Sequence, residues 1–242
     1  INAPEANITI SGAGPFMFGD ENTNLKFGLP TFGSVTPIGT IGNTRFMPMV
    51  STTVSNSVFD AVVANTTSVD LDSFNEAAVL TLKNATWTLQ QDFYLGRYSR
   101  PGKLVIGEGA TMTVPGLVYI ANETTSPGET YLEIAQGGTF NWTPPAGSNG
   151  FQFGRGVKTD DTTLKPSRVK VTGGTLNAAG GIVLVGVDLA YAYLEVEDGV
   201  FNSYGMDIRH RNNQRAKWGK AHDERYRQTG GTINLGGRGF YT

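Results

Sequence analysis

Side chains that could carry out chemistry are few in this 242-residue chain. His210 and His222 are the two histidines, and the motifs of zinc proteases, serine hydrolases and nucleotide-binding loops do not occur. Cysteine is absent, which excludes disulfides, thiolate metal sites and a cysteine nucleophile. The histidine pair lies near Asp223 and Glu224, a pattern typical of solvated loops. We therefore expect no enzyme activity, no cofactor and no metal centre.

Acidic residues provide two further groups to weigh. Asp20–Glu21 and the pair Asp70 and Asp72 have the oxygen ligands that calcium prefers, but neither completes a calcium-loop pattern, so calcium stays an open alternative. Glu195 and Glu197 alternate along an expected strand, which places both on the same outer face. We interpret that face as solvated.

The segment 209–227 is strongly basic, with seven Lys or Arg residues against Asp223 and Glu224. The basic residues are Arg209, Arg211, Arg215, Lys217, Lys220, Arg225 and Arg227. Three interpretations stay open: a solvated insertion, a contact with an acidic subunit surface, or a polyanion site. Residues 46–82 contain no Lys or Arg, and their acidic side chains are a plausible counterpart: Asp60, Asp70, Asp72 and Glu76.

The composition favours an extracellular protein. Nineteen Lys and Arg residues oppose 21 Asp and Glu residues, which argues against a nucleic-acid binder, and no apolar run is long enough for a membrane-spanning helix. The chain is rich in uncharged polar residues, with 28 Thr, 17 Asn and 12 Ser. Because it begins at Ile1 rather than Met, we expect that a signal peptide has been removed. Five sequons permit glycosylation, at Asn7, Asn65, Asn84, Asn122 and Asn141.

An internal repeat begins near residue 78. The phrases AVLTLKNATWTL, KLVIGEGATMTV, TYLEIAQGGTFNW, RVKVTGGTLNA, YLEVEDGVFNS and RQTGGTINL each join an alternating strand, a tight Gly/Asn turn and a large apolar residue. The positions just before that apolar residue are Thr86, Thr111, Thr139, Thr175, Val200 and Thr232, at spacings of 25, 28, 36, 25 and 32. A second strand follows each turn, as in FYLGR, VYIAN, FQFGR, VLVGV and MDIRH, and a small residue ends four of the five: Gly96, Ala121, Gly154 and Gly186.

Stacking of such units predicts three continuous apolar columns. The first contains Trp87, Met112, Phe140, Leu176, Phe201 and Ile233. The second contains Leu82, Ile106, Ile134, Val171 and Val196, and the third Leu95, Ile120, Phe153, Val185 and Ile208. The pattern predicts an all-β parallel β-solenoid, or β-helix, with rungs of about 25 residues. The competing architecture is a β-sandwich, which would not predict aligned columns.

Beside the first column lies a polar one: Thr88, Thr113, Asn141, Asn177, Asn202 and Asn234. Stacked Asn side chains can form a hydrogen-bonded ladder, or Asn can simply suit the corner backbone. Residues 1–75 lack the repeated phrase and form an N-terminal β-rich region, which is a set of irregular rungs, a cap or a small separate β-domain. Residues 76–242 form the repeat region, with the basic insertion at 209–227.

The repeated phrase resembles those of autotransporter passenger-type adhesins and related bacterial surface β-solenoids. The resemblance rests on LEVEDGVFN and on the V-G and L-G pairs of LVGVD and YLGRY, and covers residues 78–235. It implies a surface structural protein or adhesin, and no catalytic residues carry over. We therefore expect a subunit of a self-assembling extracellular fibre or layer whose partner is itself, joined head to tail by strand addition, with surface glycans as a further partner.

The alternative function is a carbohydrate-active β-helix enzyme similar to polysaccharide lyases, or a glycan-binding module. Such enzymes place carboxylate-bound calcium and a basic residue on one face. In this sequence the basic residues cluster in the insertion, and we expect no acidic cluster opposite them within the repeats.

Overall fold

Alternation of apolar and polar residues produces short strands throughout this chain, because every second side chain of a strand points to the same face. A computed structural model describes residues 25–27, 31–32, 44–48, 52–55, 58–60, 68–71, 79–89, 92–97, 101–122, 129–155, 167–186, 192–208 and 226–241, with backbone only up to residue 70. These residues are all-β, which confirms the predicted class, and no helix among them is long and apolar enough to cross a bilayer.

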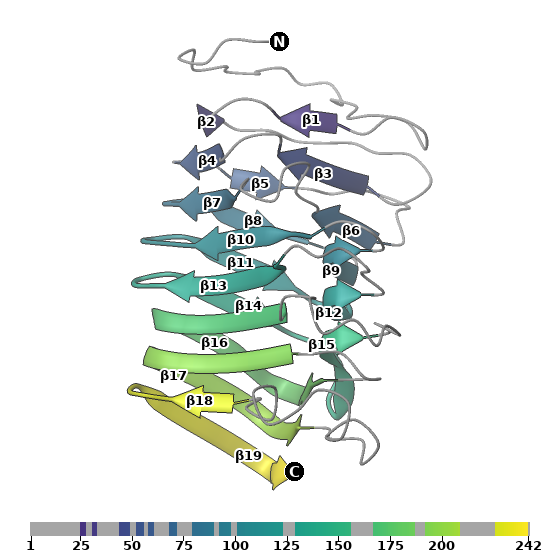
Figure 1. The fold of residues 1–242 in the computed structure, drawn as a ribbon, viewed down its shortest axis with the longest axis vertical. Coiled ribbons are helices and arrows are strands. Elements are labelled where there is room, and N and C mark those ends of the chain that lie inside the picture. Colours follow the sequence, from purple (N-terminus) through teal and green to yellow (C-terminus); the bar gives the residue numbers. More distant parts are fainter. Residues whose placement is uncertain are drawn as a thin grey trace.

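The strands follow one another without an intervening helix in the described part of the chain (Figure 1). The short strands of the first part are β1 (Leu25–Phe27), β2 (Thr31–Phe32), β3 (Thr44–Pro48), β4 (Thr52–Ser55), β5 (Val58–Asp60) and β6 (Ser68–Leu71). The middle part contains β7 (Leu80–Lys83), β8 (Thr86–Thr88), β9 (Asp92–Arg97), β10 (Lys103–Ile106), β11 (Thr111–Val114), β12 (Val118–Asn122), β13 (Tyr131–Ala135), β14 (Thr139–Trp142) and β15 (Ser148–Arg155). The last strands are β16 (Ser167–Val185), β17 (Ala192–Ile208), β18 (Tyr226–Gln228) and β19 (Thr232–Tyr241).

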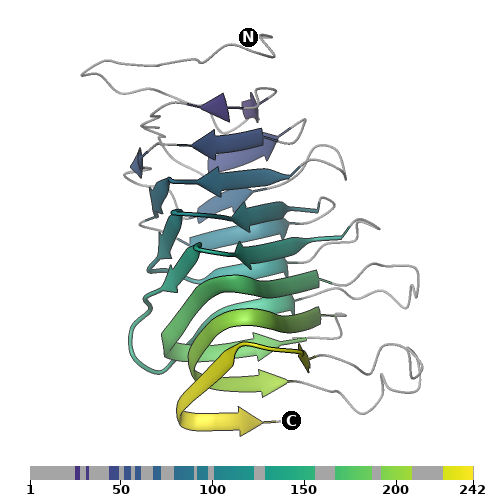
Figure 2. The same ribbon diagram turned by 90° about the vertical axis from the view of Figure 1, so that its left-hand side faces the viewer.

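All described strands belong to one curled parallel sheet, in which strands from successive repeats lie side by side (Figures 1 and 2). Three stacks result. Stack one joins β2, β4, β7, β10, β13, the first part of β16, the first part of β17, and β18. Stack two joins β5, β8, β11, β14 and the middle parts of β16 and β17 to the start of β19. Stack three joins β1, β3, β6, β9, β12, β15 and the ends of β16, β17 and β19. Parallel pairing between repeats excludes the β-sandwich, whose sheets are antiparallel.

The register of the sheet confirms the three predicted columns. In stack two, Trp87 pairs with Met112, and Phe140 pairs with both Met112 and Leu176. Leu176 in turn pairs with Phe201, and Phe201 with Ile233. The equivalent columns of stacks one and three are also continuous in the register. All members are buried except Ile233, which is partly buried at the last strand and packs against the core.

Residues with positive φ form the corners, where the chain turns between stacks. The small residues predicted after the stack-three strands all have this conformation: Gly96 (φ 70°), Ala121 (57°), Gly154 (61°) and Gly186 (76°). Between stacks one and two, Gly109 (φ 67°) lies against Asn84 of the previous repeat, and a Cβ at Gly109 would come within 2.2 Å of the Asn84 Oδ1 atom. Glycine is favoured there by its φ, which L side chains rarely adopt, and a Cβ would in addition require the Asn84 side chain to move.

Strands β1–β6 fall in the region 1–75 and pair in the same sheet as the repeats. The boundary near residue 75 stays a prediction. The alternating segment 7–11 lies outside the described residues.

The core column gives the first testable prediction. Phe140 is fully buried and packs edge-on against Phe151, with ring centroids 5.7 Å apart. Replacing Phe140 with Ala should lower the free energy of unfolding by about 3–5 kcal/mol, because it leaves a cavity in a stacked column. Chemical denaturation measures the loss. Thr81→Ala, on an outward position of β7, is the control and should change stability far less; equal losses would contradict the column.

Candidate functional site

An asparagine ladder runs along the outer face of stack two. Asn177 donates from its Nδ2 atom to the Asn141 Oδ1 atom at 2.9 Å, Asn202 donates to Asn177 at 2.7 Å, and Asn234 donates to Asn202 at 2.8 Å. The ladder hypothesis is therefore confirmed for these four residues. Because every bond points in the same direction along the stack, the amide dipoles align and reinforce one another.

The ladder is half of a broader polar surface, which we call the Thr/Asn face. It consists of the outward positions of stack two from β8 to β19, two from each strand segment. Strand β5, which precedes them in the stack, has Val58 and Asp60 in register with Thr86 and Thr88 and is not part of this face. Its first column holds Thr86, Thr111, Thr139, Thr175, Val200 and Thr232, and its second holds Thr88, Thr113, Asn141, Asn177, Asn202 and Asn234. None of the twelve side chains is buried and none is charged. The inward residues between them belong to the apolar core, so the face is fixed by the alternation of the strands.

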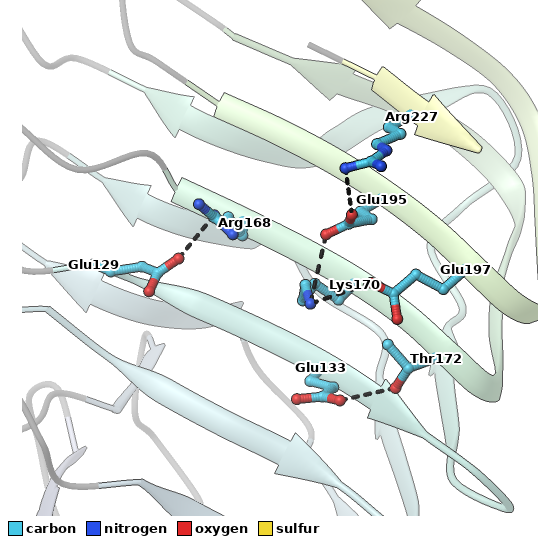
Figure 3. A network of polar contacts seen from close by, with 8 residues as sticks. All are labelled: Glu129, Glu133, Arg168, Lys170, Thr172, Glu195, Glu197 and Arg227. Atoms are coloured by element: carbon cyan, nitrogen blue, oxygen red, sulfur yellow. Dashed lines mark hydrogen bonds and ion pairs between the residues drawn. The ribbon is translucent and has the colours of Figure 1, made fainter. Parts of the chain in front are cut away.

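The outer face of stack one is charged instead (Figure 3). Along it, Glu133, Lys170, Glu195 and Arg227 occupy equivalent positions on β13, β16, β17 and β18, so the sign of the charge alternates from strand to strand. The Lys170 Nζ atom lies 3.5 Å from the Glu195 Oε2 atom and 3.5 Å from the Glu197 Oε1 atom. Arg227 reaches the other oxygen of Glu195 at 3.8 Å.

One expectation about this region is wrong, namely that Glu195 lies on a solvated face. The Glu195 side chain is only 8% exposed, and is held between two cations rather than lying on a solvated face. Glu197, at 45%, is the exposed member of the pair. Of the basic residues in the insertion only Arg227 is described, and it faces the single carboxylate of Glu195, so the expectation that no acidic cluster lies opposite the insertion stays a prediction. Sequence alternation placed Glu195 on the outside correctly but did not by itself reveal the neighbours that cover it. These lie 25 and 32 residues away, which are the spacings of the repeated phrase, so aligning the repeats is the signal that finds them.

Two further contacts extend the charged face. Thr172 donates a hydrogen bond from its Oγ1 atom to Glu133 at 2.8 Å, and the Arg168 Nε atom lies 2.8 Å from the Glu129 Oε1 atom. Burial raises the pKa of Tyr131, and the nearby carboxylates Glu133 and Glu129 raise it further. With its carboxylates matched by cations or by a hydroxyl donor, this network has the form of a structural cross-link between strands.

The last described strands, β18 and β19, lie at the far end of the sheet. Both β18 and β19 pair only with β17 among the described residues. Tyr226, Ile233 and Leu235 pack against the core but stay partly exposed there. Phe240 is 45% exposed, and its ring lies 6.0 Å from that of Tyr226. These partly exposed apolar side chains lie on the last described strands of the sheet, where a further strand could cover them.

Most of the basic insertion lies outside the described residues: Arg209, Arg211, Arg215, Lys217, Lys220 and Arg225, together with both histidines. Arg227, its described end, is the residue that contacts Glu195. Of the proposed acidic counterpart, Asp60 ends β5 and Asp70 lies in β6 opposite Arg45, whereas Asp72 and Glu76 are not described. The structure therefore does not bring the basic and acidic segments together within its described part.

The five sequons differ in their setting. Asn84 is exposed at a corner with φ 48°, Asn122 ends β12, and Asn7 and Asn65 lie outside the described residues. Asn141 accepts the first bond of the asparagine ladder. A glycan on Asn141 would have to share the Thr/Asn face with that ladder. Among the described residues, no group of three or more His, Cys, Asp or Glu is placed to hold a metal ion.

Comparison with known proteins adds no relative. No family model matches the chain, and neither the curated proteins nor the solved structures contain a match.

The ladder gives the second testable prediction. Asn177→Leu removes two hydrogen bonds, each worth about 0.5–1.5 kcal/mol, and should lower the free energy of unfolding by about 1–3 kcal/mol. Asn234→Leu removes one bond at an exposed position and should cost less. Urea unfolding of the two variants measures the difference. An Asn177 variant as stable as the parent protein would show that the ladder does not contribute.

Proposed function

We propose that this chain is an extracellular structural protein, the subunit of a self-assembling surface fibre or layer. In this proposal the curled parallel sheet is a β-solenoid with rungs of about 25 residues, preceded by an assembly region in residues 1–75, and copies join head to tail by strand addition. The in-register parallel pairing of successive repeats is the observation that carries the proposal, because such a sheet lengthens when a further strand pairs in the same register.

The chemistry of the last described strands, β18 and β19, suits strand addition. A parallel sheet extends when a new strand pairs with the free N–H and C=O groups and covers the apolar side chains beneath them. Ile233 and Leu235 point into the core at the last strand and are only partly covered, unlike the equivalent Phe201 one strand earlier. A further strand would complete their burial. A head-to-tail contact of this kind does not close on itself, so it generates a filament.

Surface location is supported by composition. The chain has no cysteine, is rich in Thr, Asn and Ser, and carries five sequons. The phrase that resembles bacterial surface β-solenoids supports the same location and an adhesive role toward surface glycans.

Residues 7–11 are the proposed entering strand, because Ile8 and Ile10 alternate with polar Asn7, Thr9 and Ser11. Deleting residues 1–12 should therefore leave a folded protein that no longer elongates. Circular dichroism checks the fold, and electron microscopy with analytical ultracentrifugation measures elongation. Normal fibres from the truncated protein, or an intact protein that stays monomeric at high concentration, would contradict strand addition by this segment.

The basic insertion gives a separate prediction. If it contacts an acidic surface of a neighbouring subunit, association should weaken as salt rises, because exposed charges are screened over about 8–10 Å near physiological ionic strength. Replacing Arg211, Arg215 and Lys217 with Glu should abolish that association. Light scattering across a salt series measures both effects. Unchanged assembly of the triple variant would identify the insertion as a solvated loop.

A further inference from the structure

The three outer faces of the sheet have three different chemistries. Stack one carries the alternating charges of Glu133, Lys170, Glu195 and Arg227. Stack three carries a mixed row of outward residues, namely Tyr94, Tyr119, Gln152, Leu184 and Asp207. The Thr/Asn face of stack two is uniform by comparison: eleven of its twelve side chains are Thr or Asn, and the exception is Val200. In-register stacking disfavours like charges but permits charges of alternating sign, as stack one shows, so the absence of charge from all twelve positions points to a neutral ligand.

The Thr/Asn face is periodic in two directions. Neighbouring strands of a sheet lie about 4.7–4.9 Å apart, and alternate residues of one strand lie about 6.6–6.8 Å apart. Six successive strand segments repeat this pattern in register, from β8 to β19. The result is a grid of hydroxyl, methyl and amide groups.

The side chains of the grid are also held in fixed orientations without a ligand. The ladder bonds of 2.7–2.9 Å fix the orientation of four amides. Threonine is β-branched and therefore restricted at χ1. Thr86, Thr88, Thr232 and Asn234 are exposed, and the other eight side chains are partly exposed, so the grid faces solvent.

Most classes of ligand do not fit this surface. Nucleic acids and other polyanions require Lys or Arg, and the face has neither. Protein interfaces concentrate their binding energy in Trp, Tyr and Arg, which are also missing from it. Small molecules bind in concave apolar sites, whereas these side chains project from the outside of a sheet. The class of ligand that is not excluded is neutral, has a structure that repeats in two dimensions, and both donates and accepts hydrogen bonds.

We propose that the Thr/Asn face binds the surface of ice. Water molecules that bridge to hydroxyl and amide groups lose entropy when they are immobilised, but water in a crystal has already lost it. Each contact is weak, yet contacts on one rigid grid add together because they bind simultaneously. Charged side chains would oppose ice binding, because each charge orients nearby water molecules around itself rather than along the ice lattice. The proposal is independent of assembly at β18 and β19.

Ice growth tests the proposal with the full chain. The intact protein should produce thermal hysteresis and inhibit recrystallisation beyond the effect of an equal mass of an unrelated globular protein. Thr139→Tyr, at the centre of the grid, should abolish both effects. Thr81→Tyr is the matched control, because Thr81 occupies an outward strand position in stack one and should leave both effects intact.

A second pair of variants distinguishes loss of ice binding from loss of folding. Thr88→Lys and Thr113→Lys add charges at solvent-facing positions and should abolish ice activity while circular dichroism and the melting temperature stay close to those of the parent. An intact protein without thermal hysteresis would overturn the proposal, as would folded face variants that keep it. Sedimentation that shows self-association lost in Thr139→Tyr, with no ice activity in the parent, would instead assign the face to a protein contact and would also overturn the proposal.

Discussion

In-register parallel pairing is the constraint on which the rest of this structure depends. Because each repeat pairs with the next in the same register, every side chain lies beside its own equivalent, about 4.7–4.9 Å away. The residue type at each position therefore has to pack against, or bond to, the same or a similar residue type on the next strand. Apolar side chains meet this requirement inside, where Phe140 lies between Met112 and Leu176. Asparagine meets it outside, because one amide is both donor and acceptor.

Charged residues can lie beside their equivalents on neighbouring strands only where the sign of the charge alternates from strand to strand. Like charges directly opposite each other on neighbouring strands are destabilising. Stack one solves this by placing Lys170 between carboxylates and Glu195 between cations. Stack two solves it from β8 to β19 by excluding charge from the twelve positions of the Thr/Asn face. The same constraint thus produces both a cross-linked charged face and a neutral one.

Close stacking also explains the corners. Backbone from one repeat lies against backbone from the next, as where a Cβ at Gly138 would come within 2.0 Å of the Ile106 carbonyl oxygen. Side chains are excluded at such points, and the positive φ of neighbouring residues turns the chain into the next stack. The frequent Gly residues of the repeated phrase are therefore a consequence of stacking rather than of flexibility.

Alternation and spacing are local properties that recur along the chain, so the all-β class, the residues of each column and their stacking order follow from the sequence alone. Trp87 and Phe201 fall in one column on spacing, and Asn177 falls in a polar column for which a ladder was one of two interpretations. The contacts by which neighbouring repeats cover one another arise only in the folded chain. The burial of Glu195 depends on the side chains of Lys170 and Arg227, whose positions match the repeat spacings of 25 and 32 but whose contacts with Glu195 the alignment does not give. The partial exposure of Ile233 at the last described strand is likewise a property of pairing between strands.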